Sequence, residues 1–165
     1  MPCNSAVDLR GKKTLSQEVL IRKATHQDIP ELYQLMIEYI VDFYKQPKPD
    51  EDELKGLIKH LLNNPAIGLQ FVAELEGQLV GFATLYFTFS TLRVKRQAVL
   101  NDLFVKANIR GKKVGEKLFQ TCLQYIRENG FCSMNWETAK DNVVAQSLYN
   151  KMGGEISPWL FYEIS

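Results

Sequence analysis

The stretch that decides the fold runs from Val99 to Asn129 and reads VLNDLFVKANIRGKKVGEKLFQTCLQYIREN. It begins with the apolar run of a strand and then passes through a turn. From Gly111 onward the apolar residues recur with the period of a helix. Asn129-Gly130 then supplies a helix stop, because both residues tolerate the left-handed conformation of a C-terminal cap. The stretch therefore predicts a strand, a turn and an amphipathic helix in direct succession.

The entrance to this predicted helix carries a basic, glycine-containing segment that suits a phosphate group. The first backbone N–H groups of a helix have no partner inside it, and the positive end of the helix dipole lies behind them. Phosphates bind at such places, and cationic side chains strengthen the attraction. The segment consists of Arg110, Gly111, Lys112, Lys113, Val114 and Gly115. Taken alone, the pattern also fits an ordinary solvated basic helix start.

Length and composition indicate one folded domain without a global charge bias. The chain has 165 residues, of which 45% are hydrophobic, and this is enough for a single core. Twenty basic residues against nineteen acidic residues leave a net charge of +1, which favours neither nucleic acid nor an anionic membrane as a partner. No apolar run approaches the length that spans a bilayer. We expect residues 1–18 to form an N-terminal extension and residues 19–165 to form a single domain.

The three cysteines, Cys3, Cys122 and Cys132, are an odd number and lack the spacing of metal ligands. They are interpreted as reduced thiols of a cytoplasmic protein, and no metal site is expected. A catalytic cysteine is the weaker alternative, because only His26 and His60 could serve as its partner. The N-terminal residues also lack the apolar region of a signal peptide.

The periodicity of the whole chain predicts a mixed α/β order. Asp28 opens the first helix, and Glu31 lies three residues on, as in a capping box. The acidic run from Asp50 to Glu53 opens the second helix, where it either complements the helix dipole or forms a negative wall for a cationic substrate. Glu76-Gly77 is a hairpin turn. The further helices begin at Gly111 and at Asn142, and the predicted strands cover residues 19–24, 69–75, 78–87, 99–105, 133–137 and 159–164.

Two segments resemble the GNAT superfamily of acyl-CoA N-acyltransferases. Arg110 to Gly115 resembles the fingerprint Gln/Arg-x-x-Gly-x-Gly/Ala, which in that family cradles the pyrophosphate of coenzyme A. Lys113 stands where the first fingerprint glycine would be. A lysine can adopt helical dihedral angles, but its side chain must then point away from the pyrophosphate or onto it. Trp136 to Gly153 resembles the second conserved region, which implies that Asn142 contacts coenzyme A and that the Tyr149 hydroxyl lies near its sulfur. Without the resemblance, these two residues fit a helix N-cap and a core aromatic equally well.

The resemblance covers roughly residues 19–164 and implies the GNAT fold, a mixed and mostly antiparallel sheet flanked by helices. It implies transfer of an acetyl group from acetyl-CoA to an amine by direct attack in a ternary complex. Tyr149 would act as the general acid, and backbone N–H groups near Phe104 and Val105 would stabilise the developing oxyanion. The implied cofactor-binding residues are Leu103, Phe104, Val105, Arg110, Gly111, Lys112, Lys113, Val114, Gly115, Asn142 and Tyr149.

A further resemblance concerns the acceptor. Residues 85–91 and 100–105 resemble the diamine acetyltransferase branch, which implies a small cationic amine such as a diamine or polyamine and a substrate site at Tyr86, Asn101 and Asp102. That branch has Glu, the usual base candidate, where this chain has Asn101, and an amide cannot act as a base. The amine proton would then pass to bulk water, an ordered water or another carboxylate such as Asp102. Without a base, we expect the rate to climb with pH well past about 8, following the free amine.

Two other functions remain open at this point. One is a protein acetyltransferase that acts on an N-terminus or a lysine, and the other is a non-catalytic acyl-CoA-binding regulatory module. The family resemblance also makes a homodimer an expectation.

Overall fold

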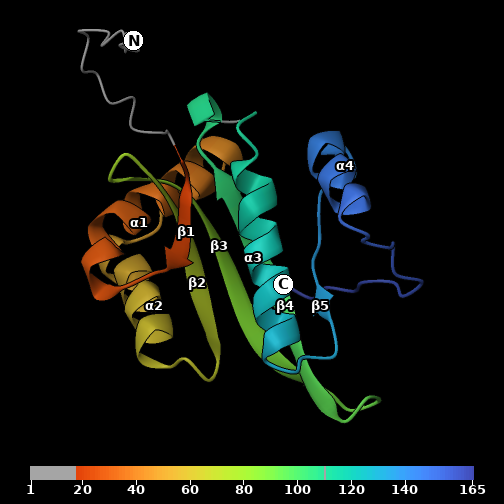
Figure 1. Cartoon of the computed structure of the whole chain (residues 1–165). Helices are drawn as coiled ribbons and strands as arrows, with labels where there is room; N and C mark the ends of the chain where they lie inside the picture. The colour runs from red at the N-terminus through yellow and green to blue at the C-terminus, as the bar shows by residue number, and fades with distance from the viewer. Residues whose placement is uncertain (1–17, 110) are drawn as a thin grey trace, which may run out of the picture.

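A five-stranded sheet with the order β1-β2-β3-β4-β5 forms the centre of the computed structural model, which describes residues 18–109 and 111–165 (Figure 1). The strands β1 to β4 pair antiparallel, and β5 pairs parallel to β4. The mixed, mostly antiparallel sheet expected from the sequence is therefore confirmed. Arg110 and nearly all of the expected N-terminal extension lie outside the described residues. The strands are β1 (Leu20–Lys23), β2 (Gly68–Leu75), β3 (Gln78–Ser90), β4 (Lys95–Val105) and β5 (Met134–Asn135).

Helices cover both faces of the sheet (Figure 1). Strand side chains alternate between the faces, so Val72 packs with α1 and α2, whereas its neighbours Phe71 and Ala73 pack with α3. The sheet is thus the middle layer of three. The α-helices are α1 (Ile29–Ile37), α2 (Glu51–Asn63), α3 (Val114–Glu128) and α4 (Val143–Lys151). Two short 3-10 helices, η1 (His26–Asp28) and η3 (Ala107–Ile109), and a π-helix, η2 (Glu38–Phe43), complete the helical elements of the described residues.

A β-bulge in β4 opens the sheet on the side of β5. The register between β3 and β4 shifts at Thr84/Leu85, so that Thr84 pairs with Asp102 and Leu85 pairs with Leu100. Asn101 is the extra residue between them. A bulge bends its strand and increases its twist. On its other edge, β4 pairs with β5 only through Ala98 and Val99, and the two strands part beyond this point.

The predicted strand at residues 159–164 is wrong, and the one at residues 133–137 is longer than the observed β5. In the part of the chain that the structure describes, the segment 159–164 pairs with no strand, and its large apolar side chains are exposed. Aromatic and β-branched residues have a propensity to pack on a sheet, but a strand also needs a partner strand. Among residues 18–109 and 111–165, none pairs with this segment.

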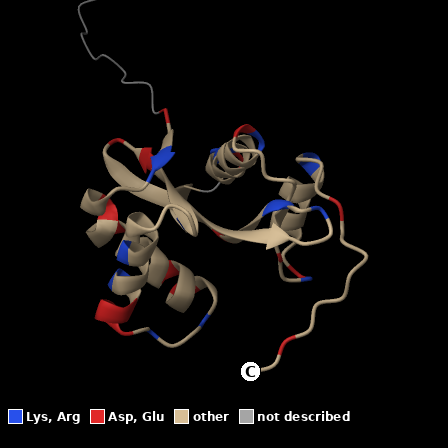
Figure 2. Ribbon diagram, turned by 90° about the horizontal axis from the view of Figure 1, so that it is seen from below, with Lys and Arg blue, Asp and Glu red and all other residues tan. Residues whose placement is uncertain are grey.

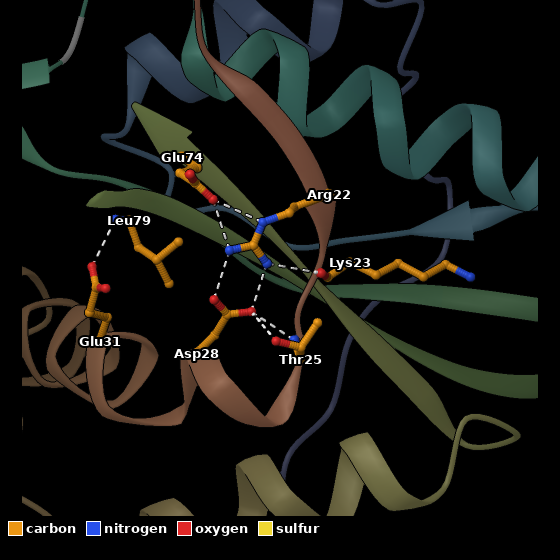
Figure 3. A network of polar contacts seen from close by, with 7 residues as sticks. All are labelled: Arg22, Lys23, Thr25, Asp28, Glu31, Glu74 and Leu79. Carbon is orange, nitrogen blue, oxygen red and sulfur yellow. Dashed lines mark hydrogen bonds and ion pairs between the residues drawn. The ribbon is translucent and has the colours of Figure 1, made fainter. Parts of the chain in front are cut away.

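The entry to α1 differs from the expected capping box. The Glu31 carboxylate accepts the backbone N–H of Leu79 at 3.0 Å and therefore ties α1 to β3. Asp28 instead accepts the backbone N–H of Thr25 at 2.7 Å and receives both terminal nitrogens of Arg22, at 2.7 and 2.8 Å (Figure 3). Arg22 also donates from Nε to Glu74 at 3.0 Å. One guanidinium thus joins β1, η1 and β2.

The acidic run at the start of α2 serves the helix. The Asp50 side chain accepts from the backbone N–H groups of Asp52 and Glu53, at 2.9 and 3.0 Å, as an N-cap residue does. Glu51 forms an ion pair with Lys55 one turn later. Asp50 and Glu51 therefore have the helix-stabilising role that was one of the two alternatives for this run.

Candidate active site

A hollow of about 420 Å³ lies where β4 and β5 part. Its size falls in the range of small-ligand sites. The bulge at Asn101 places that residue in the lining, and the chain that follows β5 forms the opposite wall. The lining residues are Tyr44, Val99, Leu100, Asn101, Glu137, Thr138 and Ala139.

Asp102 follows the bulge and carries a carboxyl group with altered acidity. Burial raises the pKa of Asp102, and this outweighs the lowering by its polar contacts with Thr84, Asn101 and Tyr39. The Asn101 amide donates to Asp102 Oδ1 at 3.1 Å. A carboxylate that is reluctant to stay charged is a better proton acceptor than an exposed one. Asp102 can therefore do the chemistry that the neighbouring amide of Asn101 cannot.

Aromatic side chains from the end of the first helix meet Asp102 and the hollow. η2, which carries Tyr39 and Phe43, is a π-helix, a rare form that is often found at functional sites. The Tyr44 ring lies 4.9 Å from that of Tyr39 and 5.0 Å from that of Phe43, centroid to centroid. Burial, followed by the charge of Asp102, raises the pKa of Tyr86 on β3. Asp102 and the expected substrate residue Tyr86 are thus brought together.

The sequence analysis missed the aromatic residues Tyr39, Phe43 and Tyr44. They occur within six positions of one another, at the place where the helical pattern ends. An aromatic cluster at a helix end was the signal that could have drawn attention to them.

Tyr149 on α4 is held between two other aromatic residues. Its ring centroid lies 5.6 Å from that of Phe119 on α3 and 5.3 Å from that of Trp136, which follows β5. Burial, followed by the nearby Tyr44, raises the pKa of Tyr149. The hydroxyl group therefore keeps its proton at neutral pH, as a general acid requires.

The start of α3 has the shape of an anion site. Gly111, with φ of 85°, lies in the left-handed region that favours glycine, and Lys113 shares that conformation at φ 60° and ψ 22°. Lys113 therefore does not adopt the helical dihedral angles that a lysine could take at this position. No side chain among the described residues caps α3, so its first N–H groups remain available to a ligand. A Cβ added at Gly115 would meet only the Val105 side chain, at 3.8 Å, so the space at the start of α3 is open. The exposed Lys112 lies just before the helix.

An ion pair connects the start of α3 to the end of α4. Lys151 Nζ lies 2.8 Å from Glu116 Oε2 and lowers the pKa of Glu116. Glu116 is in the first turn of α3, where its negative charge would oppose an incoming phosphate. The lysine offsets this charge. The sequence analysis did not identify the pair, because its partners are far apart in the chain.

The other expected cofactor residues occupy structural positions around the opening. Asn142 is the N-cap of α4, and its side chain accepts the backbone N–H of Ala145 at 3.2 Å. Phe104 is buried in the core under α1, whereas Leu103 and Val105 pack toward the α3 side. Val114 is buried at the start of α3. Each of these residues thus has a structural role, as a helix cap or in the core packing. Contacts with coenzyme A remain a prediction for each of them.

The weak alternative of a catalytic cysteine gains no support from Cys122. This thiol is buried in the core under α3, and burial raises its pKa to about 12. It therefore stays protonated and unreactive near neutral pH.

The family follows from comparison with known proteins. The sequence profile of the Acetyltransferase (GNAT) family matches residues 29–154. This chain belongs to the GNAT acetyltransferase family. An uncharacterized N-acetyltransferase of Bacillus subtilis (strain 168), YhfO, is 34% identical over 135 residues, which are 82% of this chain and 89% of the relative. The thialysine N-epsilon-acetyltransferase of Bos taurus is 25% identical over 152 residues, which are 83% of this chain and 84% of the relative.

Solved structures agree with this membership. The crystal structure of a probable acetyltransferase is similar to this GNAT chain with a TM-score of 0.79 and 28% identity, and the match covers 88% of this chain and 97% of that one. The GNAT chain is thus an acetyl-CoA-dependent N-acetyltransferase. The expected fold, reaction class and cosubstrate are confirmed. None of the helices in the described residues has the length and apolar character that a membrane crossing requires.

Proposed function

We propose that this GNAT enzyme acetylates a primary amine of a small cationic molecule, such as a diamine or polyamine. The observation that carries the proposal is Asp102, a partly buried carboxyl with a raised pKa beside a hollow lined by Tyr44 and Glu137. Aromatic faces and carboxylates are the groups that attract organic cations. The bovine thialysine acetyltransferase relative supports an acceptor of this kind.

Each residue has a distinct role in the proposed reaction. Acetyl-CoA supplies the acetyl group as a thioester. The first N–H groups of α3, with Lys112 and Lys113, would bind the pyrophosphate. Asp102 would take a proton from the ammonium group so that the amine can attack, and Tyr149 Oη would donate a proton to the departing sulfur. Holding both substrates in line supplies much of the remaining rate enhancement.

A panel of acceptors tests the substrate class. The purified protein is incubated with acetyl-CoA and a matched series of diamines, polyamines, monoamines that carry no second charge, and peptides with a free N-terminus or lysine, and released thiol is measured. We expect the best turnover with small dicationic amines. Equal turnover of the monoamines would remove the site for the second positive charge from the proposal. Acetylation of peptides without turnover of any small amine would indicate a protein acetyltransferase instead. No turnover of any acceptor would indicate a non-catalytic binding module.

The pH profile of Asp102→Asn tests the base. With Asp102 as proton acceptor, kcat/KM levels off near neutral pH, once this carboxyl has ionised. This differs from the climb past pH 8 expected for a chain without a base. Asp102→Asn should restore that climb, because only the free amine, with a pKa of about 10, then reacts. At pH 7 we expect a loss of roughly 10²- to 10⁴-fold.

Asn101→Ala is the matched control for this experiment. It removes the amide that donates to Asp102 but keeps the carboxyl, so the plateau should persist with a modest change in rate. If the unaltered enzyme and Asp102→Asn share one climbing profile, Asp102 is not the base.

A further inference from the structure

Three polar residues lie in one row across the middle strands of the sheet. Gln70 on β2 pairs with Thr84 on β3, and Thr84 pairs with Asp102 on β4. Side chains of directly opposite residues point to the same face, with their Cβ atoms about 4.5–5.5 Å apart. Val72 and Phe104, two residues along β2 and β4, pack in the core under α1 and α2, so the row lies on that face. Asp102 is thus one end of a polar row that begins inside the core.

The other two members of the row are deeply buried. Gln70 is 3% exposed and Thr84 1%. Gln70 Nε2 donates to Thr84 Oγ1 at 3.0 Å and to the Met36 sulfur at 3.7 Å, so both N–H bonds of the amide are used. Two apolar residues would fill the same space without the cost of removing polar groups from water. The pair therefore indicates a role besides packing.

The direction of the Gln70 amide decides where the Thr84 hydroxyl proton points. A hydroxyl group has one proton to donate and can accept two hydrogen bonds. Because Thr84 Oγ1 accepts from Gln70, its proton is left for another acceptor, and Thr84 is in polar contact with the Asp102 carboxyl. The opposite amide orientation would take up the Thr84 proton and leave both buried N–H bonds without an acceptor. The observed one leaves only the oxygen of this amide without a partner among the described residues.

We propose that Gln70 and Thr84 are positioning residues of the active site, in which Gln70 aims the Thr84 hydroxyl at the Asp102 carboxyl and thereby favours its charged form. The Asn101 amide, which lines the hollow, donates to Oδ1 of the same carboxyl at 3.1 Å. Asp102 is therefore held from its own strand and from the neighbouring strand. Such hydrogen bonds oppose the effect of burial, which favours the neutral acid. The inference rests on the role proposed above for Asp102, but its test can be read without that role.

Two tyrosines interact with Asp102 and also titrate. Tyr39 from η2 lies over this part of the sheet, with its ring centroid 5.7 Å from that of Phe104, and is in polar contact with Asp102. Tyr86 on β3 is affected by the charge of Asp102. Burial raises the pKa of both phenols, so they stay neutral while the carboxyl ionises. A change in the titration of Asp102 is therefore not caused by ionisation of either tyrosine.

Removal of the Thr84 hydroxyl tests the row through the acidity of Asp102. In protein with ¹³C-labelled aspartate carboxyls, the Asp102 signal is identified by its loss in Asp102→Asn and is titrated by NMR without substrate. Thr84→Val keeps the shape of the side chain and removes the donor to the charged carboxylate. We expect the titration midpoint of Asp102 to move up by about 1–2 pH units. Looser packing would admit water and move the midpoint down instead.

Three further variants complete the experiment. Thr84→Ser keeps the hydroxyl group and should restore the midpoint of the unaltered protein. Thr88→Val makes the same change at an exposed position of β3 and should leave the midpoint unchanged. Gln70→Met releases the Thr84 hydroxyl without removing it and should give a smaller rise. An unchanged or lowered midpoint in Thr84→Val overturns the proposal, and an unchanged midpoint in Gln70→Met overturns the part assigned to Gln70.

Kinetics separate this inference from the proposed function. If Asp102 is also the base, the pH at which kcat/KM levels off should rise in Thr84→Val together with the NMR midpoint. A moved midpoint with an unmoved kinetic profile would remove Asp102 as the base and support the row. A fixed midpoint in Thr84→Val, with a plateau that is lost in Asp102→Asn, would keep the base and reject the row.

Discussion

Tyr149 carries a proton that its surroundings help it to keep. The ring is packed between Phe119 and Trp136, and burial raises the pKa of its hydroxyl group. Tyr149→Phe retains the packed ring and removes only the donor. We expect kcat to fall on the order of 10²-fold with little change in acetyl-CoA affinity, measured by steady-state kinetics and calorimetry. An unchanged kcat over the whole pH range would make Tyr149 a core residue only.

Lys113 holds a backbone conformation that suits glycine better. A left-handed residue with a Cβ costs about 1–2 kcal/mol, part of which is recovered because lysine restricts the unfolded chain more than glycine does. Lys113→Gly should therefore raise the free energy of unfolding by about 1 kcal/mol. The neighbour Lys112, which has no positive φ, provides the control: Lys112→Gly should bring no gain. Equal effects in denaturant titrations would contradict the strain at Lys113.

At the scale of elements, the start of α3 is the predicted binding place for the pyrophosphate of coenzyme A. Since the chain itself leaves room at Gly115, a side chain there should harm the ligand and spare the fold. We expect Gly115→Glu to abolish coenzyme A binding in calorimetry with an unchanged melting temperature. Gly56→Glu places the same charge at an open, exposed position of α2 and should bind normally. Equal affinity of the two variants would remove α3 as the phosphate site.

The Arg22 network joins three elements and makes their stability depend on pH. Arg22 lowers the folded-state pKa of Asp28 below its ordinary value of 3.8. This contribution to stability is therefore present above that value and is lost as the pH falls through the lowered pKa. Asp28→Asn should cost about 1–3 kcal/mol of unfolding free energy at pH 7 and much less in strong acid.

Urea titrations at both pH values measure this difference. The exposed Asp141 provides the control, and Asp141→Asn should have little effect at either pH. A cost for Asp28→Asn that stays constant with pH would show that its ion pair with Arg22 does not stabilise the fold.

At the scale of the molecule, the candidate site takes residues from all three layers of the fold. The start of α3 is the predicted cofactor site, and η2 on the other face of the sheet contributes the aromatic residues Tyr39 and Phe43. Basic and acidic residues are interspersed along the ribbon (Figure 2), which agrees with a small ligand bound by local groups. Residues 155–165 and α4 expose several large apolar side chains, as does the turn between β3 and β4.

Local patterns in the chain were enough to predict much of this architecture. The strand, turn and helix from Val99 to Asn129 follow from a change of apolar period, and the hairpin at Glu76-Gly77 follows from its turn residues. The mixed sheet and the family followed as well. These features depend on neighbours in sequence, and period and turn chemistry therefore report them directly.

Other features depend on which distant segments pack together. Tyr39 meets Asp102 across more than sixty positions of the chain, and burial by that packing changes the pKa of both groups. The bulge at Asn101 depends on the register with β3. The prediction of a strand at residues 159–164 was wrong, and this segment pairs with none of the strands that the structure describes. A sequence reports what each segment favours, whereas burial, register and pairing arise only when the segments meet in the folded molecule.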